Sequence, residues 1–300
     1  MATPDRTWTD LDASGGRLEF ETLLSDLSSR FVNLPTRDVD REIEGALRSV
    51  CELVGIDLAV LWQWSAGGTE SFVVTHVHPP GLGRELGAAE SRSRYPWVTA
   101  QVLAGRTTIV PSVAALPPEA AQDRETGLAA GIRSNVTIPL AVGGERPLGA
   151  LALNTLREER DWPEALVKRL ELVAQVFASA LARRRADEAL RESEEHARST
   201  FEQAAVGIAH VGVDGRFLRV NDKLCAIVGF PREELLLKTF QEITHPDDLD
   251  LDLGQVRRVL AGEIATYSME KRYLRGDGAW LWVNLTVSLV RDRKGEPRYF

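Results

Sequence analysis

Cysteine, histidine and long apolar runs are scarce in this sequence. Its 300 residues contain 2 cysteines, Cys51 and Cys225, which form no CxxC pair and have no metal-ligand spacing. No segment approaches the roughly 20 consecutive apolar residues of a membrane-spanning helix, and residues 1–16 lack the apolar core of a secretory signal. We therefore expect no metal site, no membrane segment among these residues, and a cytoplasmic location.

An excess of positive charge is also missing, because 44 acidic residues outnumber 36 lysines and arginines. The formal net charge is −8 at pH 7, which argues against a nucleic-acid-binding surface. The one dense basic run, residues 183–185, falls in a helical pattern, where successive side chains point about 100° apart. We expect these arginines to form a solvated helix surface.

Motifs of the common catalytic classes are missing. The glycines form neither a GxGxxG motif nor a P-loop, and no GxSxG or kinase signature occurs. The carboxylates follow helical surfaces and do not gather in one segment. The sequence therefore predicts no catalytic residue in this chain.

Hydrophobic periodicity divides the chain into two domains of the α+β class, each with an antiparallel sheet. We expect a disordered tail over residues 1–17, a first domain over 18–162, a connecting helix over 163–200 and a second domain over 201–300. The last predicted turn is followed only by residues 297–300, too few to pair with the preceding long strand. The second domain is therefore expected to be truncated in its last strand.

The connecting helix carries two apolar seams. Heptad-like steps of four and three place the first seam at Leu166, Leu170, Val173, Phe177 and Ala180. A weaker seam with smaller side chains follows in the second half of the helix. We expect a homodimer through this second seam, a coiled-coil contact made by Leu190, Ser193 and Ala197.

The first domain has a distinctive series of motifs. Two helical patterns come first, then an apolar strand at residues 58–64, and later the segments IRSNVTIPL at 132–140 and PLGAL at 147–151. In this order they make residues 20–185 resemble a GAF domain.

The second domain also has several motifs in series. They are VND at residues 220–222, GFP at 229–231, HPDD at 245–248 and RGDGAW at 275–280. On these motifs, residues 201–300 resemble a PAS domain of the S-box type.

Together the two resemblances imply a sensory input module of a signal-transduction protein. Such arrays usually precede a histidine kinase core, an ATP-dependent phosphotransferase whose partner is a response regulator. The same architecture is compatible with a diguanylate cyclase or a transcriptional activator. A free-standing small-molecule-binding protein and an enzyme acting within the GAF pocket are the alternatives from other classes.

Departures from the two families bear on cofactors. Residues 223–226 do not fit the asparagine–cysteine motif of flavin-binding blue-light sensors, and the first domain has no cysteine–histidine pair for a bilin. The cyclic-GMP signature of asparagine, lysine, phenylalanine, aspartate and glutamate is also missing. We expect no flavin, bilin or cyclic nucleotide. His210, in a strand that faces the pocket in some PAS relatives, leaves haem ligation open.

A small-molecule ligand would be bound by aromatic and histidine side chains, because such pockets are mostly apolar with a few polar groups. Aromatic residues also commonly fill a core. His76 and His78 alternate on one strand without a third metal ligand, and His245 before Pro246 is interpreted as a helix boundary. The candidate ligand-binding residues are Trp62, Trp64, His76 and Trp97 in the first domain, and His210, Phe240, Tyr273 and Trp282 in the second.

Overall fold

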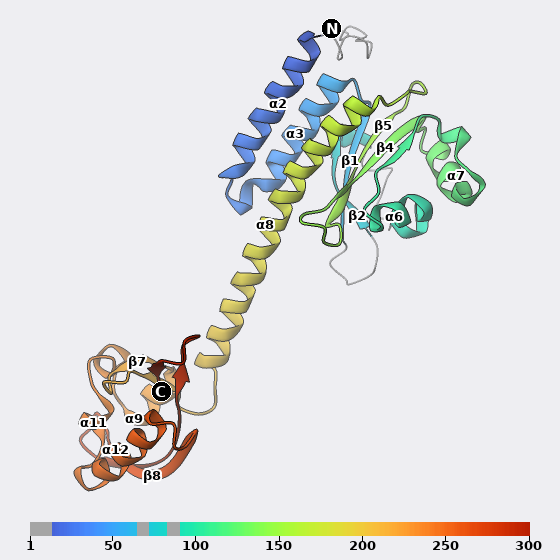
Figure 1. The fold of residues 1–300 in the computed structure, drawn as a ribbon. Helices are drawn as coiled ribbons and strands as arrows, with labels where there is room; N and C mark the ends of the chain where they lie inside the picture. The colour runs from blue at the N-terminus through green and yellow to red at the C-terminus, as the bar shows by residue number, and fades with distance from the viewer. Residues whose placement is uncertain (1–13, 65–71, 83–90) are drawn as a thin grey trace. The chain divides into compact units, whose positions relative to one another are not determined.

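The computed structural model describes residues 14–64, 72–82 and 91–300. The contacts within the chain divide it into two units, Met1–Ala189 and Leu190–Phe300 (Figure 1). Both units combine helices with antiparallel strands, which confirms the α+β class.

A five-stranded antiparallel sheet forms the centre of the first unit, in the order β2-β1-β5-β4-β3. Its strands are β1 (Leu58–Trp64), β2 (Phe72–His78), β3 (Thr108–Val110), β4 (Ser134–Leu140) and β5 (Gly149–Thr155). Gln63 of β1 pairs with Gly149 of β5, and a Cβ atom at Gly149 would collide with the carbonyl oxygen of Trp62. Only glycine fits this close approach of two strands, which explains the glycine of the PLGAL segment.

Three helices cover one face of this sheet (Figure 1): α2 (Ser14–Val32), α3 (Val39–Val54) and the first part of α8 (Glu164–Glu202). Of the expected disordered tail, residues 1–13 lie outside the described part of the chain, and α2 begins directly after them. Helix α3 ends at Gly55, whose φ of 66° is left-handed.

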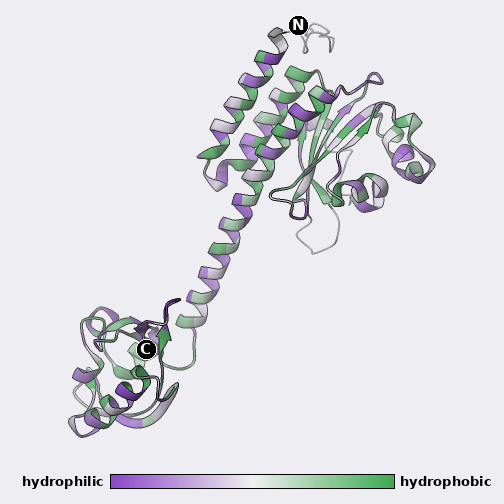
Figure 2. Cartoon of the chain, in the orientation of Figure 1, coloured by the Kyte–Doolittle hydropathy of each residue, from purple (hydrophilic) through white to green (hydrophobic). Residues whose placement is uncertain are grey.

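The first apolar seam of α8 packs against these helices and the sheet. Its members Leu166, Leu170, Val173, Phe177 and Ala180 are all buried. Phe177 meets Phe31 of α2 edge to face, with 5.7 Å between the ring centroids. This seam builds the core of the first unit, to which the hydrophobic residues along β1 and β5 also contribute (Figure 2).

Shorter helices lie on the opposite face of the sheet (Figure 1), namely α6 (Pro96–Leu103) and α7 (Ala121–Ala129). Pro96 occupies the first position of α6, where proline is favoured. The remaining short helices of this unit are η1 (Thr36–Asp38), η2 (Pro80–Leu82), α5 (Ser91–Arg94), η3 (Val113–Ala115) and η4 (Pro118–Ala120).

The basic run of α8 is not a solvated surface, so that prediction is wrong. Arg183 donates to three backbone carbonyls at and just after the C-terminal end of α2. Arg184 contacts Asp40 at the start of α3, and Arg185 donates to the carbonyl oxygen of Leu148 at 3.4 Å. Because the three side chains point in different directions, each fastens α8 to a different part of the first unit.

The second unit contains helices α9 to α12 and strands β6 to β11. The helices are α9 (Asp222–Val228), α10 (Arg232–Leu235), α11 (Phe240–Ile243) and α12 (Pro246–Leu260). The strands are β6 (Ala209–Val211), β7 (Phe217–Val220), β8 (Thr266–Leu274), β9 (Trp280–Ser288), β10 (Val290–Arg291) and β11 (Pro297–Tyr299). The pairs β6–β7, β8–β9 and β10–β11 are all antiparallel.

Helix boundaries in the second unit follow the capping rules. The side chain of Asn221 accepts from the amide of Leu224 and begins α9, and Gly229, with a φ of 73°, ends it. His245 also acts as a boundary residue, because its Nδ1 accepts from the amide of Asp247 at the start of α12. The cap is therefore His245 itself, and Asp247 lies inside the first turn.

Candidate functional site

A cavity of about 80 Å³ lies in the first unit between the sheet and the short helices α6 and α7. Leu58, Val60 and Trp62 alternate along β1 and so present one side of the strand to this cavity. Val98 and Val102 of α6 face it from the other side. Most of the cavity wall is therefore apolar, as is typical of small-molecule sites.

Three polar side chains of the sheet also line the cavity, and they bind one another. Thr137 Oγ1 donates to Asn135 Oδ1 and Asn135 Nδ2 donates to Asn154 Oδ1, each at 2.8 Å. Asn154 Nδ2 in turn donates to the carbonyl oxygen of Leu58 at 3.2 Å. These hydrogen bonds fix the orientation of both amides, so the floor of the cavity is rigid.

Asp123 of α7 positions α6 at the rim of the cavity. It is only 2% exposed, and its carboxylate accepts the amides of Trp97 at 3.1 Å and Val98 at 2.9 Å. Burial raises the pKa of Asp123, although the two amide donors act in the opposite direction. Asp123 thereby satisfies the open N-terminal amides of α6 and fixes the residue before it, Tyr95.

The hydroxyl of Tyr95 is the one buried side-chain polar atom of the cavity wall that has no hydrogen-bond partner among the described residues. The ring of Tyr95 meets Trp62 edge to face at 6.1 Å. Burial raises the pKa of Tyr95, so its hydroxyl stays protonated and can donate or accept. A buried polar group without a partner is rare and indicates a position where a ligand or water would bind.

Of the four candidates in the first domain, Trp62 lines this cavity. The indole of Trp64 instead donates to the carbonyl oxygen of Pro147 at 2.7 Å. Trp97 is not among the lining residues, but it packs against an apolar cluster whose members Val110 and Val113 line the cavity. His76 pairs with Leu61 across the strands, on the side of the sheet that faces α3. Its hydrogen bond to Asp40 of α3 places it away from the cavity.

Sequence reasoning missed the polar residues of the cavity. Asn135 and Thr137 alternate within an otherwise apolar strand, and this pattern was a usable signal of a polar floor. Tyr95 had no comparable signal, because its importance depends on a hydroxyl left without a partner in the folded unit. Asp123 was equally hidden, because it is followed in the same helix by the charged residues Arg124 and Glu125.

In the second unit, Phe240 and Tyr273 surround a lysine that the sequence reasoning did not single out. The ammonium of Lys271 lies 5.1 Å from the ring centroid of Phe240 and 4.6 Å from that of Tyr273. Lys271 Nζ also pairs with Asp252 and donates to Thr244 Oγ1 at 3.2 Å. The two candidate aromatics thus enclose a side chain of the protein itself.

The other two candidates of this unit, His210 and Trp282, are half-buried and exposed, respectively. His210 stacks on Tyr299 with 4.5 Å between ring centroids and meets Phe201 edge to face at 5.3 Å. Trp282 is 64% exposed, and the guanidinium of Arg272 lies 5.3 Å from its ring centroid. These contacts place His210 in an aromatic stack and Trp282 on the outer face of the β8–β9 pair.

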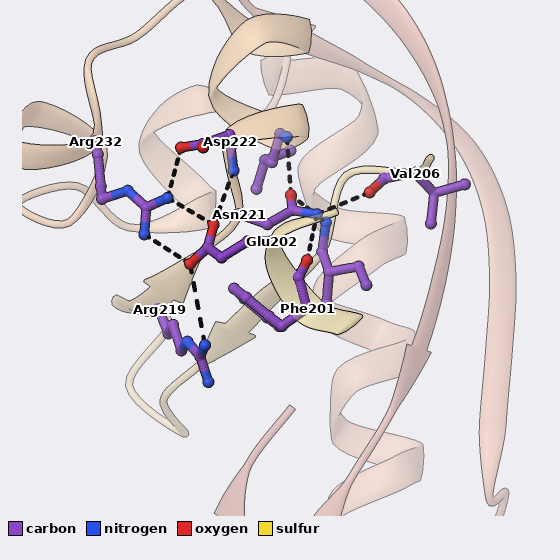
Figure 3. Close-up of polar contacts among 9 residues, drawn as sticks. Phe201, Glu202, Val206, Arg219, Asn221, Asp222 and Arg232 are labelled. Atoms are coloured by element: carbon purple, nitrogen blue, oxygen red, sulfur yellow. Dashed lines mark hydrogen bonds and ion pairs between the residues drawn. The ribbon is translucent and has the colours of Figure 1, made fainter. Parts of the chain in front are cut away.

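The end of α8 is held in the second unit by Asn221, whose side chain is fully buried (Figure 3). Its Nδ2 donates to the carbonyl oxygens of Phe201 and Val206, both at 3.0 Å. Its Oδ1 accepts the amides of Ile208 and Leu224, both at 2.9 Å. One amide therefore connects the end of α8 to the segment before β6 and to α9.

An ion pair strengthens the same connection (Figure 3). Arg232 of α10 donates to both carboxylate oxygens of Glu202, the last residue of α8, at 3.1 and 2.7 Å. These hydrogen bonds hold the pKa of Glu202 below its usual value. We call the set Phe201, Glu202, Asn221 and Arg232 the α8 joint.

Comparisons with known protein families assign both units. A GAF domain model matches residues 38–182, and a PAS fold model matches residues 217–300. Within the described ranges, no helix combines the length and the apolar character needed to cross a bilayer.

Three similar proteins illustrate the range of relatives. The chain is 49% identical over 111 residues to the probable diguanylate cyclase DgcE of Escherichia coli (strain K12), covering 37% of this chain and 10% of DgcE. It is 30% identical over 110 residues to the sensor histidine kinase TmoS of Ectopseudomonas mendocina, and this match covers 37% of this chain and 11% of TmoS. A solved GAF domain of a phosphoenolpyruvate-protein phosphotransferase from Coxiella burnetii is 16% identical, with a TM-score of 0.46, and the match covers 57% of this chain and 98% of that domain. The chain thus spans only about a tenth of these two curated relatives.

Proposed function

We propose that this chain, which joins a GAF domain to a PAS domain, senses a small uncharged molecule in its GAF cavity and passes the result along α8. Both domain types and the signalling relatives make the chain an input module of a signal-transduction protein. The identity of the stimulus and the route of the signal are the proposed parts.

The observation that carries the ligand proposal is the unpartnered hydroxyl of Tyr95 in an apolar wall. No lysine, arginine or histidine is among the described residues that line the cavity, so a bound anion would lack a counter-charge. The carboxylate of Asp123 is already occupied by two backbone amides. The chemistry therefore favours a small, mostly apolar molecule with one group that hydrogen-bonds to Tyr95.

A matched pair of probes tests this proposal. Acetone and acetate have nearly the same shape, but only acetone is uncharged. We expect acetone to shift the NMR signals of the methyl groups of Val60, Val98 and Val102 in the whole chain, and acetate to leave them unchanged. The Tyr95→Phe variant should bind acetone more weakly. Equal shifts with both probes, or none with acetone, would contradict the proposal.

The route of the signal is proposed to be α8 in a parallel homodimer. The helix is fastened at one end by the arginines 183–185 and at the other by the α8 joint. Between them, residues 188–200 are exposed on all sides. A coiled-coil contact through Leu190, Ser193 and Ala197 would cover part of this surface.

The output is proposed to be an enzyme attached to the input module. A histidine kinase acting on a response regulator is the first candidate, as TmoS is a sensor histidine kinase. A diguanylate cyclase is the second, favoured by the 49% identity to DgcE. Assays of the complete gene product for phosphate transfer from ATP and for cyclic di-GMP formation from GTP distinguish the two, with the 300-residue chain as a control. A cytoplasmic location is part of this proposal.

A further inference from the structure

A closed ring of hydrogen bonds joins four elements of the GAF unit at the base of α8. Arg184 of α8 binds Asp40 of α3 and also donates to Gln63 Oε1 of β1 at 3.2 Å. Gln63 Nε2 donates to Thr75 Oγ1 of β2 at 2.8 Å. Thr75 Oγ1 lies 3.0 Å from Nδ1 of the neighbouring His76, and His76 Nε2 lies 3.0 Å from Asp40 Oδ1, which closes the ring.

The hydrogen bonds of the ring can form with His76 either neutral or protonated. The carboxylate of Asp40 can only accept, so His76 Nε2 carries a proton in both states. In neutral His76, Nδ1 is an acceptor and the hydroxyl of Thr75 donates to it. In protonated His76, Nδ1 donates to Thr75 Oγ1, and the Thr75 hydroxyl turns to the carbonyl oxygen of Leu61, 3.3 Å away. Both imidazole nitrogens and the Thr75 hydroxyl therefore have a partner in either arrangement.

We propose that this ring is a proton-operated latch, in which protonation of His76 weakens the hold of Arg184 on Asp40 and loosens α8 from the GAF unit. When His76 is neutral, Arg184 is the one cation that contacts the Asp40 carboxylate among the described residues. Protonated His76 is a second cation on the same carboxylate and repels the guanidinium. The latch is independent of the GAF cavity, which lies on the other face of the sheet.

The surrounding charges support a switch between these states. Asp40 and Glu44 of α3 favour the protonated form of His76, and Arg184 disfavours it. Burial is the largest effect and keeps the pKa of His76 below its usual value. On the side of Arg184, Glu188 lies 3.8 Å away and can accept the guanidinium once it leaves Asp40.

The ring lies at the surface of the GAF unit, near the end of the part of α8 that packs on this unit. His76 is 6% exposed, whereas the side chain of Asp40 is 62% exposed, so protons reach the ring from the solvent side. Asp187, one turn beyond Arg184, still bonds to Thr36 at 3.0 Å. All residues of α8 from 188 to 200 are exposed. The ring therefore lies close to the point where α8 leaves the GAF unit. Its opening would remove one of the contacts that fasten the helix there, beside those of Arg183 and Arg185.

Hydrogen exchange of the whole chain tests the latch. Amides of residues 180–187 are compared at pH 7.5 and 5.5, after correction for the intrinsic pH dependence of exchange. We expect their protection to fall about two- to fivefold at the lower pH, the factor that the weakening of a partly exposed ion pair produces. In His76→Gln, which keeps a donor for Asp40 but takes up no proton, protection should stay constant. His78→Gln is the matched control, because His78 lies on the same strand outside the ring, and it should behave like the parent.

Unchanged protection in the parent, or a fall of the same size in His76→Gln, would overturn the proposal. Nitrogen NMR of the imidazoles in the unmutated chain gives a second test that needs no variant. We expect His76 to be the Nε2–H tautomer at pH 7.5 and to titrate below 6.5 together with a change in the Arg184 guanidinium signals. An Nδ1–H tautomer, or titration without a change at Arg184, would equally overturn it.

Discussion

Lys271 and Asp252 form an ion pair inside the PAS unit with side chains that are 0% and 1% exposed. The pair connects β8 to α12, and Asp252 Oδ1 also accepts the hydroxyl of Tyr267 at 2.7 Å. Burial lowers the pKa of Lys271, and the neighbouring carboxylate of Asp252 acts against that effect. Two charges are tolerated here because hydrogen bonds and aromatic rings surround them.

Removal of one member of this pair should be more damaging than removal of both charges. Lys271→Met leaves the carboxylate of Asp252 buried without a counter-charge, and we expect a loss of about 3–5 kcal/mol in the free energy of unfolding. The double variant Lys271→Met/Asp252→Asn keeps an acceptor for Tyr267 and should lose clearly less. Urea unfolding of the whole chain measures both. A double variant that is less stable than Lys271→Met would contradict this account.

Tyr95→Phe should not destabilise the ligand-free chain. The hydroxyl of Tyr95 has no partner among the described residues, so its removal relieves a desolvation penalty of about 1–3 kcal/mol at most. Asn154→Ala is the contrasting variant, because it breaks the bonds to Asn135 and to the Leu58 carbonyl. We expect thermal unfolding to show an equal or higher midpoint for Tyr95→Phe and a lower one for Asn154→Ala. A fall for Tyr95→Phe would show that the hydroxyl is already satisfied.

Much of the fold was predictable because local rules and burial agree. The caps Gly55 and Asn221 follow from residue type and position, and the seam at Leu170 and Phe177 follows from its heptad spacing. The family motifs then identified both domains. Elements with strong periodicity are therefore the part of this protein that a single sequence specifies well.

The partners of charged residues could not be predicted from the sequence where they lie far apart along the chain. The sequence predicts a solvated surface for the run 183–185, because nothing local shows that three arginines reach three different partners. Lys271 alternates with Tyr267 and Tyr273 on the inner face of β8, so its inward direction was available. Its partner Asp252 comes from α12, and such a long-range pairing leaves no spacing pattern in one sequence. The same reason hid the ring through His76.

Stability of the GAF unit should depend on pH through His76. Its pKa is lowered in the folded state, chiefly by burial, whereas the unfolded chain has the ordinary value of about 6.5. Between the two values the unfolded state binds more protons, so the free energy of unfolding rises with pH in this window. It levels off below the folded-state pKa. Denaturant unfolding from pH 5 to 7 should show this slope in the parent chain and a smaller one in His76→Gln. An equal slope in both would rule out His76 as its source.

The ion pair of the α8 joint should hold the last turn of the helix. Arg232→Gln removes both hydrogen bonds to Glu202, and we expect a loss of about 0.2–1 kcal/mol, because the pair is partly exposed. The hydrogen-exchange rates of the amides at residues 198–202 should be higher in Arg232→Gln than in the parent chain. Arg216→Gln serves as the control, since Arg216 pairs with Asp214 in a surface turn and makes no ion pair with Glu202 among the described residues. Identical exchange in the two variants would show that Asn221 alone fixes the helix end.

Disulfide cross-linking should reveal the dimer through α8. Cysteines placed singly at Leu190 or Ala197, seven residues apart, lie on one side of the helix, whereas Glu188 and Glu192 point about 200° away from Leu190. Cys51 can stay in place, because burial raises its thiol pKa to about 12 and keeps it unreactive. Cys225 is replaced by serine.

We expect efficient disulfide dimers from cysteines at 190 and 197 and poor ones from those at 188 and 192. A disulfide needs Cα atoms about 4.4–6.8 Å apart, a distance that a parallel helix pair offers only along its contact side. Ser193 and Ala197 bury little apolar area, so at about 25 cal/mol per Å² the contact is weak and the yield should rise with protein concentration. Equal yields at all four positions would indicate random collisions. A chain that stays monomeric at high concentration, without cross-links at any position, would remove α8 as the dimer contact.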